Sequence, residues 1–199
     1  MTRNDRPHLD PLPRERENQS QSLGETNAVQ FVMAFGKPGN ADGKFNRPEG
    51  LAVDAQDRIY VADSCNHRVQ IFSSDGKWLR SFGKAGSGRS EFSYPYDVRV
   101  DGAGRIYVCE YGGSRIQIFD ANCQPLEILG GPGTAPGQFH EPWAIALDSH
   151  GNLYVADALN HRVQKFLRKK LEVRSEKLEF QIAGTSEIPH SALRAPHSK

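Results

Sequence analysis

The chain is built on a period of 47 residues. Three stretches of similar sequence begin at Asp63, Glu110 and Asp157 and read DSCNHRVQIF, EYGGSRIQIF and DALNHRVQKF. The same spacing, without insertion, separates three sets of residues, which are Phe45, Phe92 and Phe139, then Pro48, Pro95 and Pro142, and then Arg68, Arg115 and Arg162. A fixed period of this length predicts one structural unit copied side by side.

Each unit holds four short segments rich in β-branched and aromatic residues. The first is GLAVD, DVRVD or AIALD, the second RIYVAD, RIYVCE or NLYVAD, and the third HRVQIF, SRIQIF or HRVQKF. The fourth is KWLRSFG or QPLEILG, and residues 29–36 (VQFVMAFG) are an earlier copy of it. Successive apolar positions in the second segment are typical of strands buried on both faces. Four short antiparallel strands per unit, stacked on neighbouring units, predict an all-β fold of β-propeller blades.

These repeated segments resemble a known family. The pattern Pro-x-Gly-Leu-Ala-Val-Asp, Ile-Tyr-Val-Ala-Asp and Asn-His-Arg-Val-Gln-x-Phe closely resembles the NHL repeat, in three copies between Phe45 and Phe166. The resemblance implies a propeller of six blades, of which about three are present, so that the propeller is incomplete. It also implies binding of proteins or RNA, while a related branch comprises lyases that cleave amidated-peptide precursors. The second copy departs from the pattern at Asp97, Val98, Arg99, Glu110, Gly113 and Ser114.

Composition divides the chain into three parts. Residues 1–27 are rich in Pro, Arg, Glu, Gln and Ser, and predict a disordered leader. Residues 28–166 hold the blades, and 14 Lys and Arg against 15 Asp and Glu give them a net charge of −1, which argues against nucleic-acid binding. Residues 167–199, with 7 against 4, form a basic tail of net charge +3. The tail predicts a short amphipathic helix, or non-native sequence after a frameshift, followed by a disordered end.

Two further features bear on the cellular compartment. No apolar run is long enough to cross a bilayer, and the first residues lack the apolar stretch of a signal peptide. The three cysteines, Cys65, Cys109 and Cys123, form no CxxC pair and are odd in number, which favours reduced, structural thiols. We therefore expect a cytoplasmic protein without membrane contact.

A set of polar residues recurs at the end of the second strand and the start of the third. Its members are Asp63, Asn66, Arg68, Arg115, Asp157, Asn160 and Arg162. Such a set at a strand end can satisfy backbone groups and bridge neighbouring strands. Because it recurs from blade to blade, it predicts a role in architecture rather than a single functional site.

The sequence offers little that predicts catalysis. His67 and His161 lie 94 residues apart and the middle copy has Ser114 at this position, so they do not make a metal coordination set. The glycine-rich linkers lack the Ser or Thr and the following helix that a phosphate loop requires. We expect no metal, no cofactor and no enzymatic activity. The alternative is the remnant of a lyase-like or lactonase-like propeller enzyme.

Binding is predicted where the copies differ from one another. The candidate partner-binding residues are Tyr96, Asp97, Arg99, Glu110, Tyr111 and Trp143. Tyr, Trp and Arg carry much of the binding energy at protein interfaces, and Tyr96, Arg99 and Trp143 are predicted to lie near one rim of the central channel. The alternative is that the aromatic side chains only fill space between blades.

These observations predict a non-catalytic binding or scaffold module for a protein partner, with RNA binding as the alternative. The strand inventory predicts a second kind of partner. The strand expected at 29–36 is the one missing from the unit that ends at Phe166, and three blades are too few to close a ring. Two chains, each completing the last blade of the other, would form a homodimer with six blades and no open edges.

Overall fold

A computed structural model describes residues 29–168 of the chain, which form three antiparallel sheets. The first sheet contains β1 (Pro48–Val53), β2 (Ile59–Asp63), β3 (Arg68–Phe72) and β4 (Trp78–Phe82). The second contains β5 (Pro95–Val100), β6 (Ile106–Glu110), β7 (Arg115–Phe119) and β8 (Pro125–Gly130). The third contains β9 (Pro142–Leu147), β10 (Leu153–Asp157) and β11 (Arg162–Phe166). Short 3₁₀ turns, η1 (Ser64–Asn66) and η2 (Ala158–Asn160), join the second and third strands of the outer sheets.

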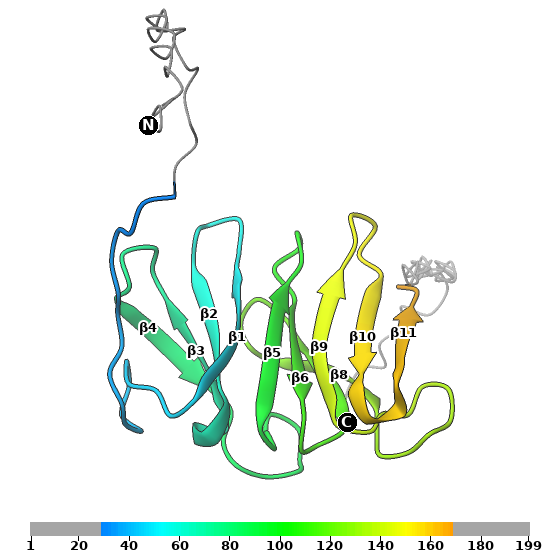
Figure 1. The fold of residues 1–199 in the computed structure, drawn as a ribbon. Helices are drawn as coiled ribbons and strands as arrows, with labels where there is room; N and C mark the ends of the chain where they lie inside the picture. Colours follow the sequence, from blue (N-terminus) through cyan, green and yellow to red (C-terminus); the bar gives the residue numbers. More distant parts are fainter. Residues whose placement is uncertain (1–28, 169–199) are drawn as a thin grey trace, which may run out of the picture.

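The three sheets stand side by side as the blades of a propeller (Figure 1). The first strand of each blade lies innermost, because β5 contacts both β1 and β9. Each following strand pairs with the one before it, from the inner to the outer edge. The predicted fold class is therefore confirmed: the chain is an all-β, incomplete propeller, with two blades of four strands and one of three.

The hydrophobic core lies between the blades. Val69 and Ile71 of the first blade pack against Val98 and Ile106 of the second, and all four are at most 1% exposed. A second cluster joins β6, β7 and the third blade through Ile116, Ile118, Ile145 and Leu153. Every residue of β6 is buried, as the continuous apolar pattern of this segment predicts for a strand covered on both faces.

The segment 29–36 is a correction to the expected strand inventory, because it forms no strand in this structure. A strand needs a neighbour for its backbone hydrogen bonds, and no strand within residues 29–168 pairs with this segment. Phe35 nevertheless packs on Phe72 and Phe45, with ring centroids 5.0 and 6.4 Å apart. The segment is therefore anchored at one end and unpaired along its length.

The expected leader at 1–27 and nearly all of the basic tail, residues 169–199, lie outside the described residues. Within residues 29–168, no helix is long and apolar enough to cross a membrane.

Candidate functional site

A buried carboxylate fastens each blade to the linker that leads into it. Asp63, at the end of β2, is fully buried and accepts hydrogen bonds from the backbone N–H of Asn46 at 2.7 Å and from the side chain of Asn66 at 2.8 Å. It also accepts hydrogen bonds from Arg68 Nε at 2.8 Å and Gln70 Nε2 at 2.9 Å. Four donors satisfy a carboxylate that would otherwise be costly to bury.

The arginine and the glutamine continue this network into the linker. Arg68 donates to the carbonyl oxygens of Ala41 and Lys44, at 2.8 and 3.0 Å. Gln70 donates to Lys44 O at 2.7 Å and accepts from Gly43 N at 3.0 Å, so both ends of its amide are used. A loop without secondary structure of its own thereby has its backbone groups paired and its course fixed.

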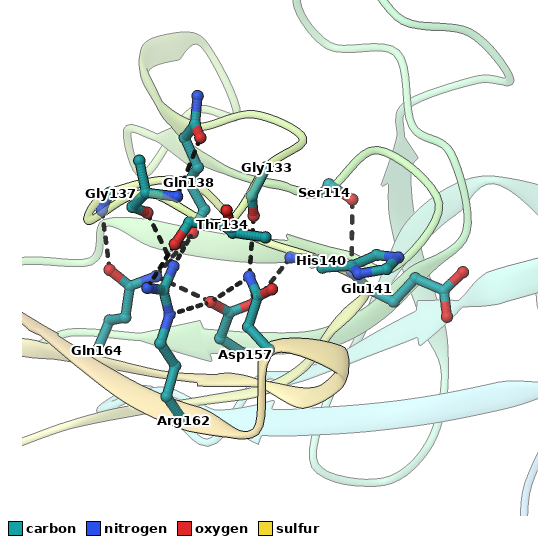
Figure 2. Close-up of polar contacts among 12 residues, drawn as sticks. Ser114, Gly133, Thr134, Gly137, Gln138, His140, Glu141, Asp157, Arg162 and Gln164 are labelled. Atoms are coloured by element: carbon teal, nitrogen blue, oxygen red, sulfur yellow. Dashed lines mark hydrogen bonds and ion pairs between the residues drawn. The ribbon is translucent and has the colours of Figure 1, made fainter.

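The third blade repeats the arrangement (Figure 2). Asp157 accepts from His140 N at 2.7 Å, Arg162 Nε at 2.7 Å and Gln164 Nε2 at 3.0 Å. Asn160 donates to it at 2.9 Å, as Asn66 does in the first blade. Burial alone would raise the pKa of the Asp157 carboxyl, but these hydrogen bonds outweigh it and the pKa is lowered.

The second blade builds the same network from different residues. Glu110 accepts from Ser93 N at 2.9 Å, from Arg115 Nε at 2.7 Å and from Gln117 Nε2 at 2.8 Å. The longer carboxylate fits because Gly113 replaces the asparagine, and a Cβ at Gly113 would lie 2.7 Å from Glu110 Oε2. The two departures from the repeat thus compensate each other. The sequence predicts Glu110 at the binding surface, and the structure corrects this, because its side chain is fully buried within the blade.

Three other predicted residues form an aromatic cluster at one end of the blades, which we call the aromatic rim: Tyr96, Tyr111 and Trp143. The rings of Tyr96 and Tyr111 stack with centroids 4.4 Å apart and an interplanar angle of 15°. The indole of Trp143 stands edge-on to both, at 5.1 and 5.8 Å. Trp143 is 51% exposed, whereas Tyr96 is 7% exposed. The structure therefore brings these aromatics from two blades together and leaves the tryptophan facing solvent.

The backbone around the aromatic rim is fixed by left-handed residues before each inner strand. Arg47, Tyr94 and Glu141 occupy equivalent positions with φ of 62°, 52° and 50°. The backbone N–H of Tyr94 donates to His67 Nδ1 of the preceding blade at 3.3 Å, and that of Glu141 donates to Ser114 Oγ at 3.4 Å (Figure 2). A side chain of one blade thus fixes the backbone at the start of the inner strand of the next blade.

Two charged residues at the rim escaped the sequence analysis. The Arg47 guanidinium lies 5.3 Å from the centre of the Tyr96 ring and is paired with Glu49 at 2.5 Å. Glu141 accepts from the Tyr111 hydroxyl at 2.5 Å, and this hydrogen bond raises the pKa of Tyr111. The signal was present in the sequence, because the position after Asn46, Ser93 and His140 holds arginine, tyrosine and glutamate in the three copies.

Asp97 and Arg99 are used elsewhere, between the inner strands. Asp97 is 4% exposed; its carboxylate accepts from Ile145 N in β9 at 2.9 Å and from Arg99 at 2.7 Å. Arg99 in turn donates to Leu51 O in β1 at 2.9 Å. Burial raises the pKa of Asp97 although these hydrogen bonds and the charge of Arg99 oppose it. The pair ties all three inner strands together, and it is Arg47 rather than Arg99 that lies over the aromatic rim.

Residues 29–168 contain no group of three or more His, Cys, Asp or Glu side chains close enough to hold a metal ion. His67 instead accepts a hydrogen bond from the backbone N–H of Tyr94.

Successive antiparallel blades, each fastened to its linker by the same carboxylate network, define a β-propeller protein of the repeat type. The family model described as NHL repeat matches residues 45–72, 92–119 and 139–166. The chain therefore carries three NHL repeats.

Curated relatives, among them the following two, match part of this chain. Protein lin-41 of Caenorhabditis elegans is 42% identical over 59 residues, which are 30% of this chain and 5% of that protein. Protein brain tumor of Drosophila melanogaster is 46% identical over 48 residues, which are 24% of this chain and 5% of that protein. The matched region is thus a small part of these relatives. A solved structure of a protein of unknown function from Bacteroides thetaiotaomicron has a TM-score of 0.50 at 20% identity, covering 60% of this chain and 34% of that chain, and shows likeness of fold alone.

Proposed function

We propose that the chain is a non-catalytic binding module that docks a protein partner on the aromatic rim. The observation that carries the proposal is the exposed indole of Trp143, held edge-on against the Tyr96 and Tyr111 rings. A large side chain already held in place loses little conformational freedom on binding, so more of its contact energy becomes affinity. The rim is also where the three repeats differ, whereas the networks that hold the blades are alike.

The charges at the rim favour a protein over RNA. One cation, Arg47, stands there with two carboxylates, Glu49 and Glu141. Nucleic acid binding depends on a local excess of Lys and Arg for the phosphates, and this balance is the opposite. A rim that holds an exposed indole and two carboxylates suits a segment that presents an apolar or cationic side chain, since both are attracted to an indole face.

The buried carboxylates support a non-catalytic role. Asp63, Glu110 and Asp157 are fully buried, and each has its oxygens occupied by backbone, arginine and glutamine donors. A general acid or base has to reach the substrate and exchange its proton with it. These groups are committed to holding the linkers.

The two tryptophans of the chain allow a matched test. Peptides are selected from a displayed random library on the whole chain, and their affinities are then measured for the Trp143→Ala and Trp78→Ala variants. Trp78 is the control, because it is 39% exposed on β4, away from the inner strands. Loss of a central aromatic anchor costs about 2 kcal/mol or more, or roughly 30-fold in affinity.

We expect Trp143→Ala to lose binding by this factor and Trp78→Ala to keep it. Equal affinity of the wild type and the Trp143→Ala variant for the selected peptides would overturn the proposal. So would a pool of random single-stranded RNA that binds the chain at physiological salt while no peptide does, because the partner class would then be nucleic acid.

A further inference from the structure

The last blade exposes a surface that is buried in the other two blades. Val163 in β11 is 70% exposed, whereas Val69 and Ile116, at the same repeat position, are 0% exposed. In the first two blades this side of the sheet is covered by the next blade along the chain. The third blade has the same kind of surface with no blade beside it (Figure 1).

The first blade exposes the complementary surface. Leu51 and Val53 in β1 are 58% and 55% exposed. At the position of Leu51 the second and third blades have Val98 and Ile145, which are 0% and 3% exposed because the preceding blade covers them. The two ends of the arc therefore carry the two halves of the interface that joins the blades inside the chain.

The segment 29–36 lies on the first blade as the fourth strand of a preceding blade would. Phe82, at the end of β4, contacts Phe92 and Phe119 at centroid distances of 5.9 and 5.0 Å. Phe35 makes the equivalent contacts one repeat earlier, at 6.4 Å from Phe45 and 5.0 Å from Phe72.

The rest of this segment is uncovered, with Phe31 80% and Val32 84% exposed. The backbone of this segment has no neighbouring strand with which to form hydrogen bonds within residues 29–168.

That missing strand is present at the other end of the arc. In the first two blades the third strand pairs with a fourth, in a register that sets Val69 opposite Phe82 and Ile116 opposite Leu129. In the third blade β11 is the outermost strand. In the second blade, Ile118 of β7 lies opposite Glu127 of β8. Lys165 lies one repeat after Ile118 in the sequence, and Met33 lies two repeats before Glu127. The same register in the third blade would therefore set Lys165 opposite Met33.

We propose that two copies of this chain close into a ring of six blades, in which residues 31–36 of each copy form the fourth strand of the third blade of the other. Propellers have typically four to eight blades, so three blades cannot close alone, two copies give six, and three copies give nine. A two-fold ring makes the same contact twice and removes both open ends at once. This inference stands on the ends of the arc and does not depend on the aromatic rim.

Two side chains bear on the fit of this interface. His161 occupies the position of His67, which accepts a hydrogen bond from the backbone of the next blade, and in the ring it would receive the N–H of Arg47 of the second copy. Lys165 departs from the pattern, because its equivalents Ile71 and Ile118 are buried. Its ammonium lies 5.1 Å from the centre of the ring of Tyr154, the residue opposite it in β10.

The register gives a direct covalent test on the full chain. Met33→Cys and Lys165→Cys, made together, place two thiols opposite each other only in the proposed ring, at a separation that a disulfide spans. Val32→Cys with Lys165→Cys is the matched control, because a shift of one residue turns the thiol to the other face of the strand. After mild oxidation we expect the first variant to run as a disulfide-linked dimer on a non-reducing gel, and the control variant to run as a monomer. The wild type should also run as a monomer, and it shows whether the three native cysteines cross-link on their own.

The mass in solution is measured beside this by sedimentation. We expect twice the mass of one chain at micromolar concentration, and a single-chain mass for Val163→Asp. Leu167→Asp is the control, since Leu167 is also 70% exposed but has Asp120 at the equivalent position of the second repeat. A folded single chain by sedimentation and circular dichroism, equal cross-linking by the two cysteine pairs, or a Val163→Asp variant that stays paired would each overturn the proposal.

Discussion

The replacement of Phe92 by alanine tests whether the blades are held together by the linker phenylalanines. Phe92 is fully buried, and its ring stands edge-on to Phe82 in the preceding blade and Phe119 in its own, at 5.9 and 5.7 Å. Truncation of a buried phenylalanine costs about 3–5 kcal/mol, and the cost is highest where the cavity cannot collapse. Both flanking rings are fixed by strands, so we expect a loss of about 4 kcal/mol in the free energy of unfolding.

Phe45→Ala is the internal comparison. Phe45 holds the same position one repeat earlier and contacts Phe35 and Phe72, but it is partly exposed because no blade within residues 29–168 covers it on that side. In a single chain its truncation should therefore cost about half as much as that of Phe92. If the ring of two chains forms, Phe45 becomes buried and the two costs converge.

Urea unfolding at several protein concentrations measures both variants. Tryptophan fluorescence reports on the first blade through Trp78 and on the third through Trp143, and circular dichroism reports on all strands. A loss below about 1.5 kcal/mol for Phe92→Ala would refute the reasoning, because it would mean that the interface relaxes around the cavity. Different urea midpoints for the two tryptophans would also refute the reasoning, since the blades would then not unfold together.

Two further predictions concern single residues. Gly83 has φ of 94°, and a Cβ there would lie 2.3 Å from the Phe92 ring, so Gly83→Ala should lower the melting temperature by at least about 4 °C. Gly102→Ala, where nothing lies within 4 Å, should leave it unchanged; equal shifts in both would refute the steric argument. The hydrogen bond from Asn152 lowers the pKa of Asp148 to about 2, below its unfolded value of 3.8. Its contribution to stability is therefore present above pH 4 and fades between pH 4 and 2, and a urea midpoint that Asp148→Ala shifts equally at pH 7 and pH 2.5 would contradict this.

The blades were predictable because each repeat states its structure locally. Short segments rich in β-branched and aromatic residues, separated by turns at fixed spacing, specify four strands, and the period of 47 indicates that the units stack. The recurrence of Asp63, Asn66 and Arg68 likewise indicates a structural role. Their hydrogen bonds show that this role is to satisfy the buried carboxylate and to hold the linker. Gln70 recurs just as strictly, but a neutral polar side chain within an otherwise apolar strand does not by itself indicate its hydrogen bonds to Asp63 and to the linker.

Other features depend on partners that a local pattern does not contain. The segment 29–36 has the composition of a strand, yet strand formation requires a hydrogen-bonded neighbour, and β11 lies at the far end of the arc. The burial of Glu110 does not follow from its own position in the repeat. Its fit depends on the second change, Gly113, which makes room for the longer side chain.

The middle repeat shows how departures from a repeat divide into structural and functional ones. Asp97 and Arg99 stand where the other blades have only Gly50 or Ala144 and Ala52 or Ala146. An innermost strand has one edge without a neighbouring strand, so its N–H and C=O groups need other partners. Asp97 supplies an acceptor to β9 and Arg99 a donor to β1, so one pair serves the blades on both sides. The side chains of Asp97 and Arg99 therefore stabilise the fold by bonding to backbone groups. Trp143 at the rim is exposed and holds no backbone group in place. This difference separates the architectural residues from the surface available to a partner.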